Sequence, residues 1–134
     1  MIAAKEGRTT LYVCRAQLSD GVHPGATDGT LCLIPNKGSV VEATEYEIAA
    51  GRDYSWLAGG WQDAVAAGLQ HGRTALYPCR AAVTSAGGRN VVVVGKSYRT
   101  GMHAGHCYVG YQDHEVDVTT GFEVLRSSTA ARSR

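Results

Sequence analysis

The chain has 134 residues, of which 44% are hydrophobic and 19% charged, a composition typical of one globular domain. Its 13 basic and 12 acidic residues give a net charge of +1, which argues against nucleic acid and anionic membranes as partners. The longest apolar run, residues 91–94, is strand-sized, so the sequence predicts no membrane span.

The N-terminal stretch MIAAKEGRTTLYV contains no apolar core of a secretory signal. We therefore expect a cytoplasmic protein, with release by a non-classical route left open. In a reducing compartment, cysteines are expected to remain thiols, and most of them to be buried. The four cysteines concerned are Cys14, Cys32, Cys79 and Cys107.

A ten-residue segment near the start of the chain recurs in its second half. GRTTLYVCRA at 7–16 returns as GRTALYPCRA at 72–81, with eight of ten positions identical and an offset of 65. Further on, TLCLIPNKG parallels GHCYVGYQD, and EYEI parallels FEVL. The sequence therefore predicts one domain over 1–126, made of two repeats at about 1–60 and 61–126, and a flexible tail over 127–134.

Alternation of apolar and polar residues predicts short strands in both repeats. In chain order these are TLYVCRA, TLCLIP, YEIAA, HCYVGY and HEVDV. Each repeat has few apolar residues for a core of its own, so we expect an all-β fold in which the two form a pseudo-twofold β-sandwich of short antiparallel strands. GGWQDAVAAGLQ, between the repeats, could form a helix, but we favour a loop and a strand because its VAA aligns with the IAA at 2–4.

LYVCRAQLSDGVHPGA, the cysteine-containing strand after it and EYEI together resemble the DM9 repeat, a β-rich unit usually found as tandem pairs. The matches run from Ile2 to Leu125. The resemblance implies a lectin that binds mannose-type glycans, without catalysis or a cofactor, and it allows a homodimer. It also implies that two residues contact the sugar: an acidic residue six positions before the leucine of LY, and the lysine of a PGK block.

The acidic position of that pattern has changed in both repeats. It falls on Lys5, beside Glu6, in the first repeat and on Gln70, beside His71, in the second. A glutamine keeps an acceptor for a sugar hydroxyl but loses the charge of a carboxylate. The resemblance therefore implies weaker or altered binding.

The lysine position falls on Ala26 in the first repeat and on Lys96 in the second. Ala26 precedes Cys32 by 6 residues and Lys96 precedes Cys107 by 11, whereas His106, the other candidate, precedes Cys107 by only 1. That spacing is too short for His106, so Lys96 is the expected sugar-binding lysine.

Three histidines lie in GMHAGHCYVGYQDHEV, residues 101–116. HAGHC lacks the paired spacings of a zinc site, and on a strand His106 and Cys107 would point to opposite faces, so we expect no metal. We instead expect His103 and His114 at the rim of a sugar pocket. The full set of expected ligand-binding residues is Lys96, Gln70, His71, Glu6, Lys5, His103 and His114.

All four cysteines recur at matching positions of the two repeats, Cys14 with Cys79 and Cys32 with Cys107. Repeated positions are typical of a core and not of a single nucleophile, so we expect no enzyme. Two alternatives stay open. One is a disulfide within each repeat, if the protein reaches an oxidising compartment. The other is a protein-interaction or self-assembling module whose sugar site has decayed, which the missing lysine in the first repeat favours.

Overall fold

The computed structural model describes residues 2–6, 9–49, 54–58, 61–84, 87–88, 90–111 and 114–127. Over these residues the chain is all-β, as expected, with thirteen strands and no helix. The strands are β1 (Ile2–Glu6), β2 (Thr9–Leu18), β3 (Gly21–Thr27), β4 (Cys32–Asn36), β5 (Ser39–Ala43), β6 (Glu47–Ile48), β7 (Tyr54–Ala58), β8 (Gly68–Gln70), β9 (Thr74–Thr84), β10 (Asn90–Ser97), β11 (Cys107–Tyr111), β12 (His114–Val118) and β13 (Glu123–Ser127).

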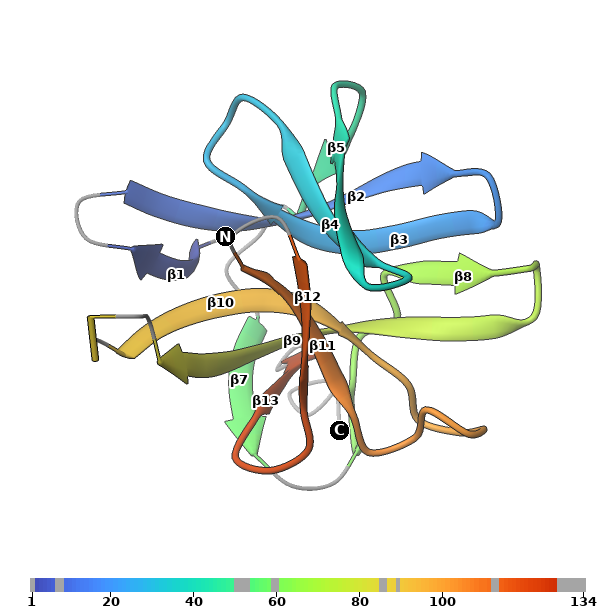
Figure 1. The fold of residues 1–134 in the computed structure, drawn as a ribbon. Helices are drawn as coiled ribbons and strands as arrows, with labels where there is room; N and C mark the ends of the chain where they lie inside the picture. Colours follow the sequence, from blue (N-terminus) through green and yellow to red (C-terminus); the bar gives the residue numbers. More distant parts are fainter. Residues whose placement is uncertain are drawn as a thin grey trace.

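The strands form one hydrogen-bonded sheet that closes on itself. Its order is β1-β2-β3-β4-β5-β12-β11-β10-β9-β13-β7, while β6 pairs with β2 and β8 pairs with both β3 and β9. Figure 1 shows β2 and β3 above β9 and β10, with β8 between the two pairs. On the other side β12 meets β5 through the pair His114 and Ser39. This closed sheet takes the place of the expected sandwich, because strands of the two halves pair edge to edge.

The strands of the two halves follow the same order and register. Cys14 lies opposite Gly25 between β2 and β3, and Cys79 lies opposite Gly95 between β9 and β10. Arg15 pairs with Glu47, and in the same way Arg80 pairs with Glu123. The pseudo-twofold symmetry of the whole fold stays a prediction.

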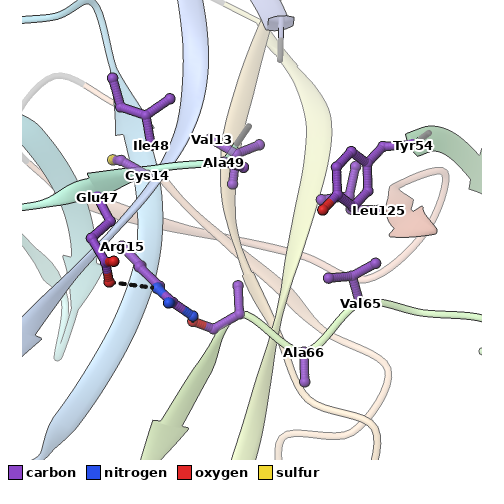
Figure 2. Close-up of a pocket in the computed structure, with 11 residues that line it drawn as sticks. Val13, Cys14, Arg15, Glu47, Ile48, Ala49, Tyr54, Val65, Ala66 and Leu125 are labelled. Atoms are coloured by element: carbon purple, nitrogen blue, oxygen red, sulfur yellow. Dashed lines mark hydrogen bonds and ion pairs between the residues drawn. The ribbon is translucent and has the colours of Figure 1, made fainter. Parts of the chain in front are cut away.

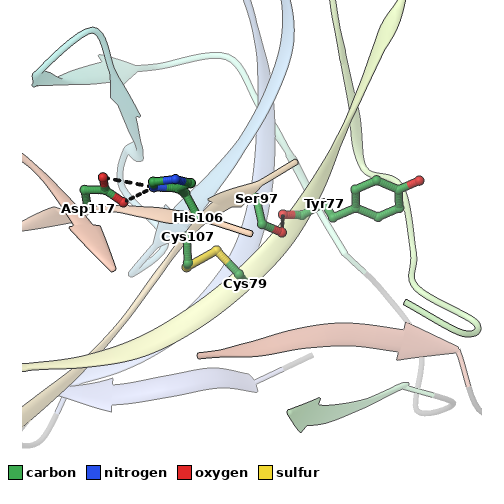
Figure 3. The surroundings of a disulfide bond; sticks show 6 residues. All are labelled: Tyr77, Cys79, Ser97, His106, Cys107 and Asp117. Carbon is green, nitrogen blue, oxygen red and sulfur yellow. Dashed lines mark hydrogen bonds and ion pairs between the residues drawn. A yellow bond between two sulfur atoms is a disulfide. The ribbon is translucent and has the colours of Figure 1, made fainter. Parts of the chain in front are cut away.

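Both pairs of cysteines are bridged, Cys14 with Cys32 and Cys79 with Cys107. The expectation of four reduced thiols is therefore wrong, and the alternative pairing within each repeat is the one found. The Cα atoms of the two pairs lie 6.0 and 6.1 Å apart, a separation that a disulfide spans. Figure 3 shows the second bridge joining β9 to β11.

Over the described residues, the core consists of three apolar clusters. One surrounds the bridge of the first half and contains Ala16 and Ile34. Another surrounds the bridge of the second half and contains Val93 and Val109. The third, made of Val13, Ala26 and Val94, joins the halves. Each repeat thus has a cluster around its own buried disulfide, and the third cluster is shared between the repeats.

The segment between the repeats is a loop and a short strand, as favoured from the sequence. Ala64 forms an isolated bridge with Arg126, and β8 follows. At the C-terminus, Ser127, the first residue of the expected tail, pairs with Tyr54 and belongs to β13. Residues 128–134, on which the rest of that prediction falls, lie outside the described residues.

Candidate ligand site around Lys96

Lys96 lies near the end of β10 and points into a polar contact between the two halves. Its side chain is buried, with a relative exposure of 2%. The Nζ atom lies 2.9 Å from Nδ1 of His23 and donates to Oδ1 of Asn36 at 3.1 Å. His23 lies on β3 and Asn36 ends β4, so both partners belong to the first half of the chain.

The contact continues from His23 to the loop before β9. Nε2 of His23 lies 2.8 Å from Oδ1 of Asp20, and Nε2 of Gln70 donates to Oδ2 of Asp20 at 3.0 Å. The hydroxyl of Tyr98 donates to Oε1 of Gln70 at 3.1 Å. The backbone N–H of His71 donates to the carbonyl of Asp20 at 2.6 Å. Lys96 and the Gln70–His71 loop, both expected at the site, are thus linked through Asp20.

The direction of these hydrogen bonds follows from the chemistry of the groups. An ammonium can only donate, so Nδ1 of His23 accepts, and Nε2 then carries the proton that is donated to Asp20. Burial, reinforced by the charge of Lys96, lowers the pKa of His23 and keeps the ring neutral. The hydrogen bond from Gln70 lowers the pKa of Asp20 to about 2, and burial lowers the pKa of Lys96 to about 8. At neutral pH a cation and an anion are therefore joined by a neutral imidazole.

A row of side chains leads from Lys96 across the neighbouring strands. Lys96 lies opposite Tyr108 of β11, and Tyr108 lies opposite Asp117 of β12. Directly opposed residues of antiparallel strands point to the same face of a sheet. Nδ1 of His106 lies 2.8 Å from Oδ1 of Asp117, and its ring stacks on Tyr108 at a centroid distance of 5.6 Å. Nδ1 of His103 lies 2.7 Å from the Tyr108 hydroxyl.

Two further residues complete this surface. The ring of Tyr98 lies 5.1 Å from that of His103, and burial raises the pKa of Tyr98 to about 12. Glu115 accepts a hydrogen bond from the backbone N–H of Gly38 at 3.3 Å, and its charge acts to raise the pKa of Lys96 against the effect of burial. We call this surface the Lys96 face. It comprises Lys96, Tyr98, His103, His106, Tyr108, Glu115 and Asp117.

The remaining expected residues, His114, Lys5 and Glu6, lie on β12 and β1. His114 is exposed at the start of β12, opposite Tyr111 and Ser39. In β1 the backbone of Glu6 lies opposite Thr9, just as Gln70 lies opposite Thr74 in β8. By this register Glu6, and not Lys5, corresponds to Gln70. The side chains of Lys5 and Glu6 lie outside what the structure describes.

Sequence reasoning missed Asp20, His23, Asn36, Tyr108 and Asp117 as members of the site. Asp20 supplies the carboxylate that position 70 lacks, but it comes from the other half of the chain. The sequence contains one signal for Asp117. Asp117 aligns with Glu42, so an acidic residue follows the second cysteine at the same place in both repeats. Figure 3 shows His106 directed to Asp117 while Cys107 points to Cys79, so the expectation of opposite faces is confirmed.

A separate cavity of about 230 Å³ is lined by Val13, Cys14 and Arg15 of β2 (Figure 2). Nε of Arg15 donates to Glu47 at 3.0 Å beside it, and Tyr54 and Leu125 form its far wall. Among its described lining residues none belongs to the Lys96 face.

Over the described residues, no group of three or more His, Cys, Asp or Glu side chains could hold a metal ion. Within that same part of the chain, no helix is long and apolar enough to cross a membrane.

The family model described as the DM9 repeat matches residues 5–118, which include the Lys96 face up to Asp117 and the network beneath it. No curated protein matches the sequence.

Proposed function

The chain belongs to the DM9 repeat family, and on that premise we propose that it binds carbohydrate, recognising mannose-type glycans at the Lys96 face without catalysing a reaction. The observation that carries this proposal is the row of Lys96, Tyr108 and Asp117 across three neighbouring strands. The row offers a cation, an aromatic ring and a carboxylate on one side of the sheet. These groups suit the acceptors, the C–H faces and the hydroxyl donors of a hexose.

Lys96 supports binding from beneath the surface. Two N–H groups of its ammonium are taken by His23 and Asn36, which leaves the third without a partner among the described residues. The exposed side chains of His103 and Asp117 make the first contacts with the sugar, and the buried ammonium of Lys96 adds its charge from below. Because charge-assisted hydrogen bonds are stronger than neutral ones, this arrangement favours a ligand rich in hydroxyls.

Calorimetric titration with methyl α-mannoside and mannose oligosaccharides tests the proposal. Asp117→Asn should weaken binding about 10-fold, the loss expected when one charged hydrogen-bond acceptor is neutralised. Glu42→Gln is the matched control, because Glu42 has the register of Asp117 in the first half and lies away from the Lys96 face. A wild-type protein that binds no mannose-type sugar would refute the proposal, and so would equal effects of the two substitutions.

A second candidate is a self-assembling or protein-interaction module in which the sugar site has decayed. The burial of Lys96 favours it, since a lysine held at 2% exposure by two protein partners can act as a purely structural group. Sedimentation across a concentration series separates the candidates. A decayed lectin associates while ignoring mannose, whereas a lectin binds mannose whether or not it forms the homodimer that the family resemblance allows.

We also propose that the protein works in an oxidising compartment, in place of the cytoplasm expected from the sequence. Two buried disulfides support this, because such bridges persist where glutathione and thioredoxin do not reduce them. Thiol labelling of protein taken from its native source, before and after unfolding, tests the proposal. Four labelled cysteines in the unfolded, unreduced protein would contradict it.

A further inference from the structure

A larger cavity lies between the two halves, and its first-half wall has the register position of the Lys96 face. It has a volume of about 510 Å³ and is lined by residues of β3, β4 and β5 and by residues of β10 and β11. Ala26 lies opposite Leu33, and Leu33 lies opposite Glu42. This row has the register of Lys96, Tyr108 and Asp117 in the second half, and all three of its members line the cavity.

Because residue 26 is an alanine, the floor of this cavity is apolar and lacks the cation that Lys96 provides at the same register position. Ala26 packs with Val13 and Val94 in the cluster that joins the halves, and Val94 also lines the cavity. A lysine here, like Lys96, would extend four carbons and an ammonium from the same backbone position. Tyr111 adds an aromatic ring to the wall. The space can therefore take the C–H face of a small ring against aliphatic and aromatic carbon.

Charge at the mouth of this cavity has one sign. Asp28 and Glu42 line it and are exposed, and none of its described lining residues is Lys, Arg or His. Asp28 is held in place because its Oδ1 accepts hydrogen bonds from the backbone N–H of Thr30 at 3.0 Å and from its hydroxyl at 2.6 Å. These bonds lower the pKa of Asp28, so its carboxylate stays charged at neutral pH. A ligand that fits must bring hydrogen-bond donors and positive charge.

We propose that this cavity binds a protonated amino sugar, with the ammonium at Asp28 and Glu42 and the apolar ring face against Ala26 and Tyr111. The volume lies within the range of small-molecule sites. The site differs in ligand charge from the Lys96 face, where a lysine takes the place of Ala26. Binding of the amino sugar requires only the cavity and its carboxylates, so it does not depend on sugar binding at the Lys96 face.

Titration of the full chain with glucosamine at pH 6, where the amine is charged, tests the inference. N-acetylglucosamine has the same ring without the charge and should bind about 10-fold more weakly, the loss of one charge-assisted hydrogen bond. Propylamine has the charge without the ring and should also bind more weakly. Equal binding of glucosamine and its N-acetyl form would overturn the proposal, and equal binding of propylamine would reduce the site to a general cation site, which also overturns it.

Matched substitutions locate the binding. Glu42→Gln should weaken glucosamine binding about 10-fold, and Asp117→Asn, at the same register in the second half, should leave it unchanged. Asp28→Asn is a second variant, and both it and Glu42→Gln change exposed side chains. If Asp117→Asn, and not Glu42→Gln, weakens glucosamine binding, the ligand lies on the Lys96 face, and this inference fails while the proposed function stands. If the protein binds no mannose but Glu42→Gln weakens glucosamine binding, the proposed function fails and this inference stands.

Discussion

The ammonium of Lys96 in the second half lies 2.9 Å from Nδ1 of His23 in the first. His23 in turn contacts Asp20, so a buried cation is separated from a carboxylate by one neutral ring. This arrangement satisfies the polar atoms of three buried or nearly buried side chains, which would otherwise destabilise the contact between the halves.

Lys96→Met should abolish a rise in stability with pH. The pKa of Lys96 is about 8 in the folded protein and 10.5 for a free side chain, so between these values the unfolded chain binds more protons and the fold gains stability as pH rises. From pH 7 to 9.5 this gain is about 2 kcal/mol. Urea unfolding at pH 7, 8.5 and 9.5 measures it. The series stops there because the raised pKa of Tyr98, about 12, acts in the opposite sense above pH 10. If the variant gains as much stability between pH 7 and 9.5 as the wild type does, Lys96 is not the source of the gain.

Asp20→Asn should cost about 2 kcal/mol of folding free energy at pH 7, since an amide replaces the charged acceptor of two hydrogen bonds. The pKa of Asp20 falls from 3.8 to about 2 on folding, so its contribution is complete above pH 3.8 and is lost as pH falls through 2. The difference between wild type and variant should therefore narrow at acid pH. Unfolding free energies at pH 7, 4 and 2 test this, with Glu42→Gln, a change at an exposed carboxylate, as control. A constant difference would show that Asp20 acts only through packing.

The strands and their repetition could be predicted because both leave local signals. Alternating residues mark β2, β4, β9 and β11, and the repeated cysteines mark matching places in the two halves. The strand register agrees with the alignment of Ala26 with Lys96, since Ala26 lies opposite Val13 and Lys96 opposite Pro78. These features depend on period and spacing, which a single sequence displays.

The closure of the sheet and the network under Lys96 could not be predicted in the same way. The three residues of β8 and the single pair of His114 with Ser39 are too short to produce a periodic signal. His23 and Lys96 lie 73 residues apart and do not occupy matching positions of the repeat. Contacts of this kind arise from the way the halves meet, and no local pattern encodes them. The choice between thiols and disulfides depends on the compartment, which no strand pattern or spacing encodes.

Removing either disulfide should destabilise the protein by about 3–4 kcal/mol, as expected for closed loops of this size. The bridges span separations of 18 and 28 residues. We expect the longer one, Cys79–Cys107, to contribute slightly more, because its removal frees more conformations of the unfolded chain. Paired Cys→Ala variants compared by urea unfolding measure both effects. A loss below 1 kcal/mol for either pair would mean that the fold does not need that bridge.

Gly95→Ala should prevent stable folding, because a Cβ at this position would overlap the backbone carbonyl oxygen of Tyr108. Backbone of a paired strand cannot yield without breaking the ladder between β10 and β11, so we expect a loss above about 4 kcal/mol. Gly110→Ala is the control, since its Cβ would meet the side chain of Val40 at 2.9 Å, which can rotate away at a cost of about 1 kcal/mol. Thermal unfolding compares the two variants. If they unfold at similar temperatures, the close approach of β11 to Gly95 does not position Lys96 beside Tyr108.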